Sequence, residues 1–245
     1  MRLTVVASSS HGNCYLLEAG NEALLLECGV KIQQIKQALG FDFSRVCGCL
    51  VSHEHKDHAK AARDVMMAGV DLFCSSSTAQ VLNLEGHRLN ILQPMAQATI
   101  GSFTVLPFPT EHDAAEPLGF LIQHPAEGKL IFLTDSYYSK YKFTDPSYIM
   151  IECNYCLDIL QQNVADGLVP EALKNRILQS HFSLEHVKQF LQANVTTATR
   201  KIILMHLSDD NSDAALMQRE VQELTGIDTV VADAGLVVEL VLFPF

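Results

Sequence analysis

Short apolar stretches separated by turn residues dominate the first half of the chain. They are rich in β-branched residues, and Gly, Asn and Pro punctuate them, which is typical of strands and hairpins. Other segments have apolar positions at helical spacing. The pattern predicts strands at residues 3–7, 15–18, 23–28, 46–52, 71–74, 103–108, 119–124, 129–134, 201–205, 229–232 and 236–242. It predicts helices at residues 32–39, 59–68, 170–179, 184–193 and 213–224.

The order of these segments limits the fold class. Strands dominate early and alternate with helices late, which predicts an α+β protein whose sheets pack on each other with helices outside. The chain contains no internal repeat, linker or compositional break. We therefore expect one domain over residues 1–245.

Composition excludes several protein classes. A hydrophobic content of 48% excludes intrinsic disorder, and no apolar run reaches the roughly 18 residues of a membrane-spanning helix. The apolar stretch within the first ten residues is too short for the apolar region of a secretory signal, and this segment predicts a strand instead. The seven cysteines are an odd number, and several lie in apolar runs, as Cys47 and Cys49 do on one expected core face of a strand. We expect a reducing, cytoplasmic location.

Acidic side chains outnumber basic ones, with 28 Asp and Glu against 17 Lys and Arg and a net charge of −11. A surface that binds long nucleic acid is usually basic, so this balance argues against tight duplex binding. A small positive site in an acidic body stays compatible with it. The sequence indicates neither a membrane nor a protein partner.

The most informative stretch is the hexapeptide of residues 53–58 (HEHKDH), between the predicted strand 46–52 and a helical pattern. In an extended chain, His53 and His55 point to the same side, and Asp57 and His58 follow where the chain turns into the helix. Imidazoles and carboxylates are ligands that zinc, manganese or iron accept. Four ligands so close together are arranged more easily around two adjacent ions than around one. The alternative is a solvated loop in which Asp57 caps a helix.

Three further candidate ligands stand at the ends of apolar runs. His112 follows the run 103–109, Asp135 follows 130–134, and His206 follows 202–205. Strand ends are where a rigid sheet presents side chains to a cleft. Each residue alone is typical of an ordinary loop, but their shared placement favours one metal site with the hexapeptide.

The hexapeptide matches the signature loop of the metallo-β-lactamase-fold hydrolases, and the chain resembles this family. The resemblance implies a four-layer αβ/βα sandwich, in which two mixed β-sheets are flanked by helices and carry a dinuclear site at one edge. It implies two divalent metal ions, zinc first, with manganese or iron as alternatives. The ligands it implies are His53, His55 and His112 for the first ion, Asp57, His58 and His206 for the second, and Asp135 as the bridge.

Within the family, the chain is similar to the YycJ/WalJ-type branch, which implies a DNA exonuclease. Segments 8–14 (SSSHGNC), 110–114 (TEHDA), 180–183 (SHFS) and 206–208 (HLS) follow the order of that branch. The chain departs from the family at Glu27, where Asp is usual, at Tyr155, where His is common, and at Ser136 and Tyr137, which replace a small pair. These departures leave the metal ligands intact and the exact substrate open.

The charge of such a site favours a phosphodiester. Two divalent ions with Asp57, Asp135 and a bridging hydroxide leave about +1, and metal binding lowers the pKa of water to about 7. By resemblance to phosphodiesterases of the fold, Glu152 and His181 form a proton-donating pair, so Asp57, Glu152 and His181 are the catalytic candidates. The alternative is a strand-end Glu and a merely polar His before a helix, and both interpretations stay open.

Two functions therefore compete. The first is a dinuclear phosphodiesterase or nuclease, DNA exonuclease-like, that uses a metal-bridging hydroxide on the ends or short segments of nucleic acid. The second is a small-molecule carbonyl hydrolase, a thioesterase or lactonase, for which Glu152 and His181 are dispensable. An iron protein of electron transfer ranks last, because its flavin-linked relatives carry Glu where this chain has His55. Cys153 and Cys156 lack the second pair that a structural zinc needs, so we expect two buried or semi-exposed thiols.

Overall fold

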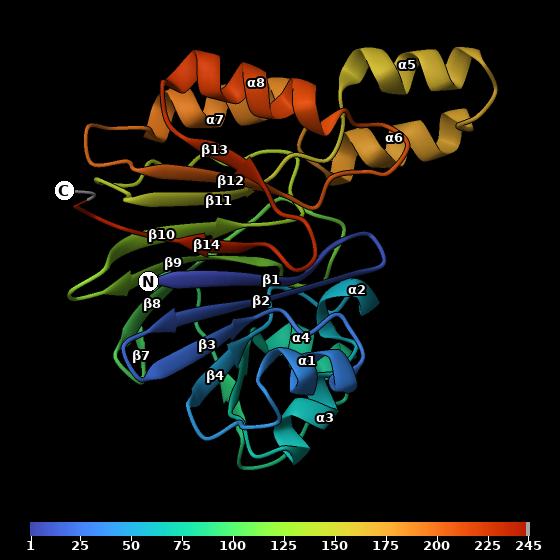
Figure 1. Cartoon of the computed structure of the whole chain (residues 1–245). Coiled ribbons are helices and arrows are strands. Elements are labelled where there is room, and N and C mark those ends of the chain that lie inside the picture. Colours follow the sequence, from blue (N-terminus) through green and yellow to red (C-terminus); the bar gives the residue numbers. More distant parts are fainter. Residues whose placement is uncertain (244–245) are drawn as a thin grey trace.

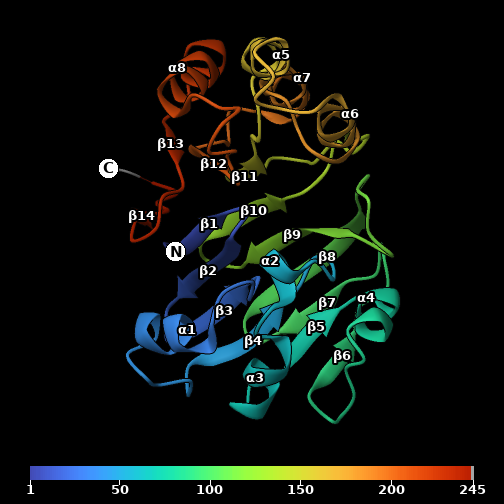
Figure 2. The ribbon, with the colours of Figure 1, turned by 90° about the vertical axis from the view of Figure 1, so that its right-hand side faces the viewer.

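Two β-sheets pack face to face in the computed structural model, which describes residues 1–243, and helices cover both outer sides (Figures 1 and 2). The first sheet has the order β14-β1-β2-β3-β4-β5-β6. Its strands are β1 (Arg2–Ser9), β2 (Gly12–Ala19), β3 (Glu22–Leu26), β4 (Val46–Leu50), β5 (Leu72–Cys74), β6 (Leu89–Ile91) and β14 (Val237–Glu239).

The second sheet repeats this plan with the order β13-β12-β11-β10-β9-β8-β7. Its strands are β7 (Ala98–Ile100), β8 (Phe103–Pro109), β9 (Leu118–His124), β10 (Gly128–Leu133), β11 (Tyr148–Glu152), β12 (Lys201–Met205) and β13 (Thr229–Val231). In each sheet the strands that come first in the chain pair antiparallel and the later ones pair parallel, except that the last strand, β14, pairs antiparallel with β1. The predicted α+β class and four-layer sandwich of two mixed sheets are confirmed.

Helices of the first half cover the first sheet, and the last two helices cover the second, while the two helices before them pack on each other beyond its strands (Figure 1). The first group is α1 (Ile32–Ala38), α2 (Lys56–Ala59), α3 (Ala62–Met67) and α4 (Ser76–Val81). The second group is α5 (Leu157–Ala165), α6 (Glu171–Ser180), α7 (Leu184–Asn194) and α8 (Ala214–Thr225). In the described part of the chain, every helix is too short or too polar to cross a membrane.

Three apolar layers fill the sandwich, because each sheet is covered on both faces. Along β3, Leu24 and Leu26 face the core between the sheets, whereas Ala23 and Leu25 face the core under α1–α4. A third core lies between the second sheet and α7–α8. Strands covered on both faces are apolar at nearly every position, which is why their sequences show continuous apolar runs.

The structure corrects several element predictions. The helix predicted at residues 59–68 is two short helices, and α2 begins at Lys56, so Asp57 and His58 lie inside a helix. The short elements α4, β6 and β7 and the helix α5 were not predicted. Elements of three to six residues are too short to show a period in the sequence, because tertiary pairing stabilises them rather than local pattern.

Cys47 and Cys49 face opposite sides of the first sheet, not one side. Cys47 packs on the core between the sheets and Cys49 on the core under α1–α4. The register between β3 and β4 shifts at this point, from Ala23 opposite Val46 to Leu24 opposite Gly48. The extra residue of this β-bulge reverses the direction of the side chains that follow.

Candidate metal centre

The predicted site residues stand at the carboxyl ends of strands from both sheets. In the first sheet, Glu27 and His53 follow β3 and β4, which pair in parallel. In the second sheet, Asp135 follows β10, Glu152 ends β11 and His206 follows β12, and these strands are also parallel. The carboxyl ends of parallel strands meet at one edge of a sheet, so these side chains converge there.

A first group of potential ligands consists of His53, His55, His112 and Asp135, whose donor atoms lie within 4.8 Å of one another. Nε2 of His112 lies 3.2 Å from Nδ1 of His55 and 3.5 Å from Oδ2 of Asp135. Nε2 of His53 lies 3.8 Å from the same carboxylate oxygen. Three imidazoles and one carboxylate thus surround a single point.

A second group consists of Asp57, His58, Asp135 and His206, again within 4.8 Å of one another. Nε2 of His58 lies 3.3 Å from both Oδ2 of Asp57 and Oδ1 of Asp135, and Nε2 of His206 lies 3.4 Å from Oδ2 of Asp57. Asp135 therefore turns Oδ2 toward the first group and Oδ1 toward the second. All seven residues predicted as metal ligands come together in one place.

These residues fit a divalent cation. Nε2 of His53 is buried and has no hydrogen-bond partner within residues 1–243, while its Nδ1 lies 2.8 Å from Oγ of Ser52. Burial lowers the pKa of His53, which keeps the ring neutral and able to ligate. A buried ring nitrogen left without a partner requires an explanation such as an ion. The combination of imidazole nitrogens with carboxylate oxygens suits zinc, manganese and iron.

The carboxylates make the site attractive to cations. Burial alone would lower the pKa of His206, but Asp135, Asp57 and Glu152 outweigh it and raise that pKa to about 10. Burial would raise the pKa of Asp135, yet the imidazoles of His206 and His58 hold it well below its ordinary value. The ionised carboxylates create a negative potential, and the raised pKa of His206 shows that this potential favours positive charge at the site. A metal cation would be stabilised in the same way.

Polar groups behind the imidazoles fix their orientation. Nδ1 of His112 lies 2.8 Å from the carbonyl oxygen of Ser180, to which it can donate. Nδ1 of His206 lies 3.3 Å from Oε1 of Glu152, to which it can donate, and Nδ2 of Asn154 donates to the His206 carbonyl oxygen at 3.0 Å. Such outer partners select the ring nitrogen that faces a metal. Asn154 had no predicted role, because no pattern in the sequence links it to His206.

Glu27 is fully buried and joins the metal loop to β3. Its carboxylate accepts hydrogen bonds from the backbone N–H of Ser52 at 3.2 and 3.3 Å, and Oε2 lies 3.7 Å from Nδ1 of His58. The longer side chain that replaces the usual Asp thus still reaches the loop.

Glu27, Asp135 and His206 all have positive φ, of 63°, 35° and 55°. This costly backbone conformation turns the chain sharply after a strand, and it is typical of functional sites.

Two further residues support the loop without having been predicted to do so. Gly29 packs so closely on the backbone of Asp57 that no side chain fits between them. Asn13 donates from Nδ2 to the carbonyl oxygen of Ser9 and lies 3.2 Å from Nε2 of His58. The Gly-Asn pair at residues 12–13 was part of the resemblance, but its side-chain role became visible only in the structure.

Glu152 and His181 form a close pair beside the second group. Oε1 of Glu152 lies 2.6 Å from Nδ1 of His181, and Oε2 accepts the backbone N–H of Ser136 at 3.0 Å and of Phe182 at 3.2 Å. Burial would lower the pKa of His181, but the Glu152 carboxylate outweighs it and raises that pKa above its ordinary value. Asp135, Glu152, His181 and His206 have donor atoms within 4.8 Å of one another. The pair therefore adjoins the candidate ligands.

The site opens into a cavity of about 410 Å³. Its walls include His55, Asp57, His181 and His206 and, on α6, the side chain of Arg176. The predicted catalytic residue His181 therefore faces the same space as the candidate ligands.

The cysteines and Tyr155 lie apart from this chemistry. Cys153 and Cys156 are buried thiols, as predicted, and within the described residues all seven cysteines are free. Tyr155 is buried, and its backbone forms an isolated bridge with Ser183. That bridge holds the segment of His181 near the end of β11.

Known proteins similar to this chain include members of a metal-dependent hydrolase family, in agreement with the geometry of the site. A family model described as the beta-lactamase superfamily domain matches residues 22–207. The exodeoxyribonuclease YycJ of Bacillus anthracis is 27% identical over 240 residues, which cover 91% of this chain and 89% of that protein. The exodeoxyribonuclease WalJ of Streptococcus pneumoniae serotype 2 (strain D39) is 25% identical over 229 residues, which cover 86% and 83%.

Among solved structures, the metallo-β-lactamase fold protein YhfI of Bacillus subtilis is similar to this chain, with a TM-score of 0.73 and 17% identity. The alignment covers 97% of this chain and 99% of that one. At this identity the likeness concerns the fold alone.

Proposed function

The chain belongs to the beta-lactamase superfamily and is a hydrolase of the metallo-β-lactamase type, and on this basis we propose that it hydrolyses phosphodiester bonds in nucleic acid, as a DNA exonuclease. Its similarity to two relatives named exodeoxyribonucleases, over more than four fifths of each chain, supports this substrate class. We further propose that His53, His55 and His112 hold one ion, that Asp57, His58 and His206 hold a second, and that Asp135 bridges the two.

The observation that carries the proposal is the contact of 2.6 Å between Glu152 and His181 beside the candidate ligands. A carbonyl hydrolase that expels a thiolate has little use for a proton donor, whereas an alkoxide that leaves a phosphodiester needs a proton. Glu152 occupies Nδ1 of His181, which leaves Nε2 to deliver the proton. The pKa of His181, raised by Glu152, keeps the imidazole charged for this step.

Divalent ions held by this donor set, zinc first, would supply Lewis-acid stabilisation and a nucleophile at neutral pH. The residues of the chain do the remaining work. Asp57 and Asp135, which line the cavity, would neutralise part of the cation charge and leave a small positive charge that suits a monoanionic diester. Glu152 and the Ser180 carbonyl oxygen can accept the Nδ1–H groups of His206 and His112, which leaves Nε2 of each ring free to ligate.

The overall charge of −11 limits how nucleic acid binds. An acidic surface repels a long duplex, so we propose that the ends or short single-stranded segments are the substrate.

We also infer that residues 1–245 act as one domain, because both sheets share one core. The seven free thiols support the cytoplasmic location.

The test is turnover by metal-reconstituted enzyme of labelled DNA, labelled RNA, bis(4-nitrophenyl) phosphate and a panel of thioesters. We expect hydrolysis of DNA and of the diester, and loss of both activities in an Asp57→Ala variant. Hydrolysis of thioesters without hydrolysis of any diester would instead support the carbonyl hydrolase. DNA as the preferred polymer would distinguish an exodeoxyribonuclease from a ribonuclease.

A further inference from the structure

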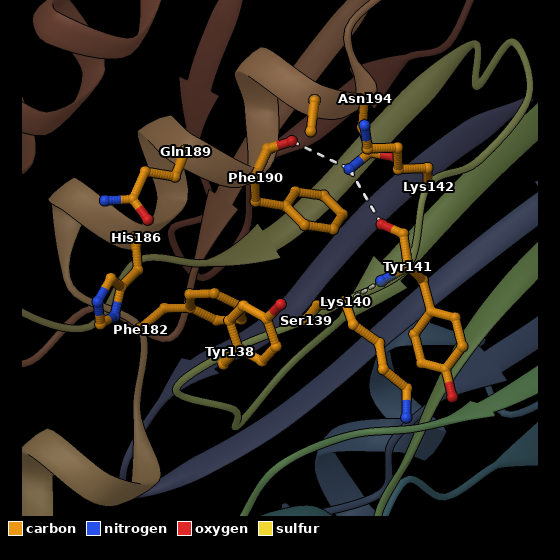
Figure 3. Close-up of a pocket in the computed structure, with 11 residues that line it drawn as sticks. Tyr138, Ser139, Lys140, Tyr141, Lys142, Phe182, His186, Gln189, Phe190 and Asn194 are labelled. Carbon is orange, nitrogen blue, oxygen red and sulfur yellow. Dashed lines mark hydrogen bonds between the residues drawn. The ribbon is translucent and has the colours of Figure 1, made fainter.

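A second cavity, of about 210 Å³, lies between the segment of residues 138–142 and helix α7 (Figure 3). The rings of Tyr138, Phe182 and Phe190 line it, together with Lys140, Lys142 and His186. Figure 3 labels Tyr138, Phe182 and Phe190 among the side chains that line it. The cavity shares no lining residue with the metal cavity.

Hydrogen bonds hold the walls of this cavity in place. Asn194, which is buried at the end of α7, accepts the backbone N–H of Phe143 at 2.8 Å and donates to the carbonyl oxygens of Tyr141 and Phe190 (Figure 3). Oγ of Ser136 donates to the carbonyl oxygen of Tyr138 at 2.8 Å. The segment is therefore tied at both ends, and its aromatic wall is preorganised for a ligand.

The charge of the cavity contrasts with that of the whole chain. Among the residues that the structure describes, no Asp or Glu lines it, whereas the lining residues Lys140 and Lys142 are exposed, and Nζ of Lys140 lies 5.6 Å from the centre of the Tyr141 ring. The protein as a whole has a net charge of −11, so this local excess of positive charge would attract an anionic ligand to the cavity. Lysines interleaved with aromatic residues in the sequence 137–142 (YYSKYK) are typical of grooves that bind single-stranded nucleic acid.

The aromatic side chains leave room for a flat ring. Tyr138 is 54% exposed, so one face of its side chain is open to a ligand. His186, which lines the cavity, has a buried Nδ1 that lacks a hydrogen-bond partner in the described part of the chain. An aromatic surface with polar and cationic neighbours fits a nucleobase together with its phosphate better than an aliphatic ligand.

The cavity lies close to the metal centre along the chain. Tyr138 is the third residue after Asp135, which limits the distance between their Cα atoms to about 10 Å. Phe182 directly follows His181. The cavity and the metal centre are therefore close enough for neighbouring nucleotides of one strand to reach both.

We propose that this cavity binds one base of a single-stranded nucleic acid whose scissile bond lies at the metal centre. The base stacks on Tyr138, and Lys140 and Lys142 contact the neighbouring phosphates. This inference rests on the proposed phosphodiesterase function and adds to it a site that selects a polymer over a small diester.

The test compares a labelled single-stranded oligonucleotide with bis(4-nitrophenyl) phosphate, which is too small to reach both sites. In Tyr138→Ala, the ratio of kcat/KM for the oligonucleotide to kcat/KM for the diester should fall about tenfold, the size of one lost base–aromatic stack. Tyr138→Phe keeps the ring and should retain the ratio. The double variant Lys140→Ala, Lys142→Ala should bind the oligonucleotide more weakly, with a smaller dependence on salt, as measured by fluorescence anisotropy on the metal-reconstituted enzyme with a phosphorothioate oligonucleotide that resists hydrolysis.

The outcomes separate the two proposals. If the wild-type enzyme hydrolyses neither substrate, the proposed function fails. If it hydrolyses both and the ratio is the same in Tyr138→Ala, the cavity does not bind the strand and this inference is wrong. An oligonucleotide that lacks the base bound in the cavity should be insensitive to Tyr138→Ala, and equal sensitivity would likewise overturn base stacking. Binding of polyglutamate as tight as that of the oligonucleotide would show a general anion site and also contradict the inference.

Discussion

The backbone of Gly29 lies directly against the backbone of Asp57, so that a Cβ atom on Gly29 would be only 1.6 Å from the Asp57 carbonyl oxygen. The N–H of Gly29 donates to the carbonyl oxygen of Asn13 at 2.9 Å, and that of Cys28 donates to His58 at 2.8 Å. The first bond joins the segment after β3 to β2, and the second joins it to α2, the helix that carries two of the proposed ligands. Only glycine permits the approach.

Replacement of Gly29 should therefore disturb the metal centre. Gly29→Ala forces the two backbones apart, and we expect a loss of about 3 kcal/mol in the free energy of unfolding, with less bound metal. Urea denaturation and metal analysis measure both effects. Gly167→Ala is the control, because no described atom lies within 4 Å of its added Cβ; its positive φ of 74° should cost about 1 kcal/mol and leave the metal content intact. Equal losses of metal in both variants would contradict this account.

The proton-donor role of His181 predicts a dependence on the leaving group. His181→Ala should slow oligonucleotide hydrolysis by about 10²- to 10⁴-fold, because the departing alkoxide needs a proton. Hydrolysis of bis(4-nitrophenyl) phosphate should decline much less, because its phenolate leaves without one. Steady-state rates on both substrates, with metal content as a control, measure the difference. Equal declines at unchanged metal content would show that His181 has another role.

Removal of metal should destabilise the fold. Ions that bind only the folded chain add about 2.7 kcal/mol at a concentration 100 times their Kd, so EDTA should lower the Tm. Elemental analysis should give two ions per chain, and a value of one would contradict the dinuclear proposal. Asp135→Asn, which alters the carboxylate shared by both groups, should abolish the effect of EDTA on Tm. The exposed His87→Ala is the matched control and should retain it.

Glu27 should support metal binding from behind His58. Glu27→Gln keeps the shape but removes the charge 3.7 Å from Nδ1 of His58, and loss of such an outer partner lowers metal affinity about 10- to 100-fold. Competition with a chelator measures the affinity. Glu18→Gln removes a carboxylate that pairs with Arg2 and Arg45 away from the site, and its metal affinity should stay at the wild-type value. A similar decrease in both variants would argue against a specific role for Glu27.

The candidate ligands could be predicted because the signals for them are local. Four of them lie in one hexapeptide, and His112, Asp135 and His206 each follow an apolar run that became a strand. The boundaries near the site were harder to predict. Helix α2 begins at Lys56 because His58 and Ala59 both donate to the carbonyl oxygen of His55, a turn that hydrophobic spacing does not reveal.

The amino-acid sequence alone determined the fold class, the kinds of ligand and the strand ends that carry them, because apolar periodicity and residue chemistry are properties of short segments. Tertiary structure alone decided that Gly29 meets Asp57, that Asn154 donates to the His206 carbonyl oxygen and that Tyr138 faces α7 across a basic cavity. Each of these contacts joins segments far apart in the chain. Their geometry follows from how the sheets and helices pack and from the positive φ values at Glu27, Asp135 and His206, which the packing of the surrounding structure maintains.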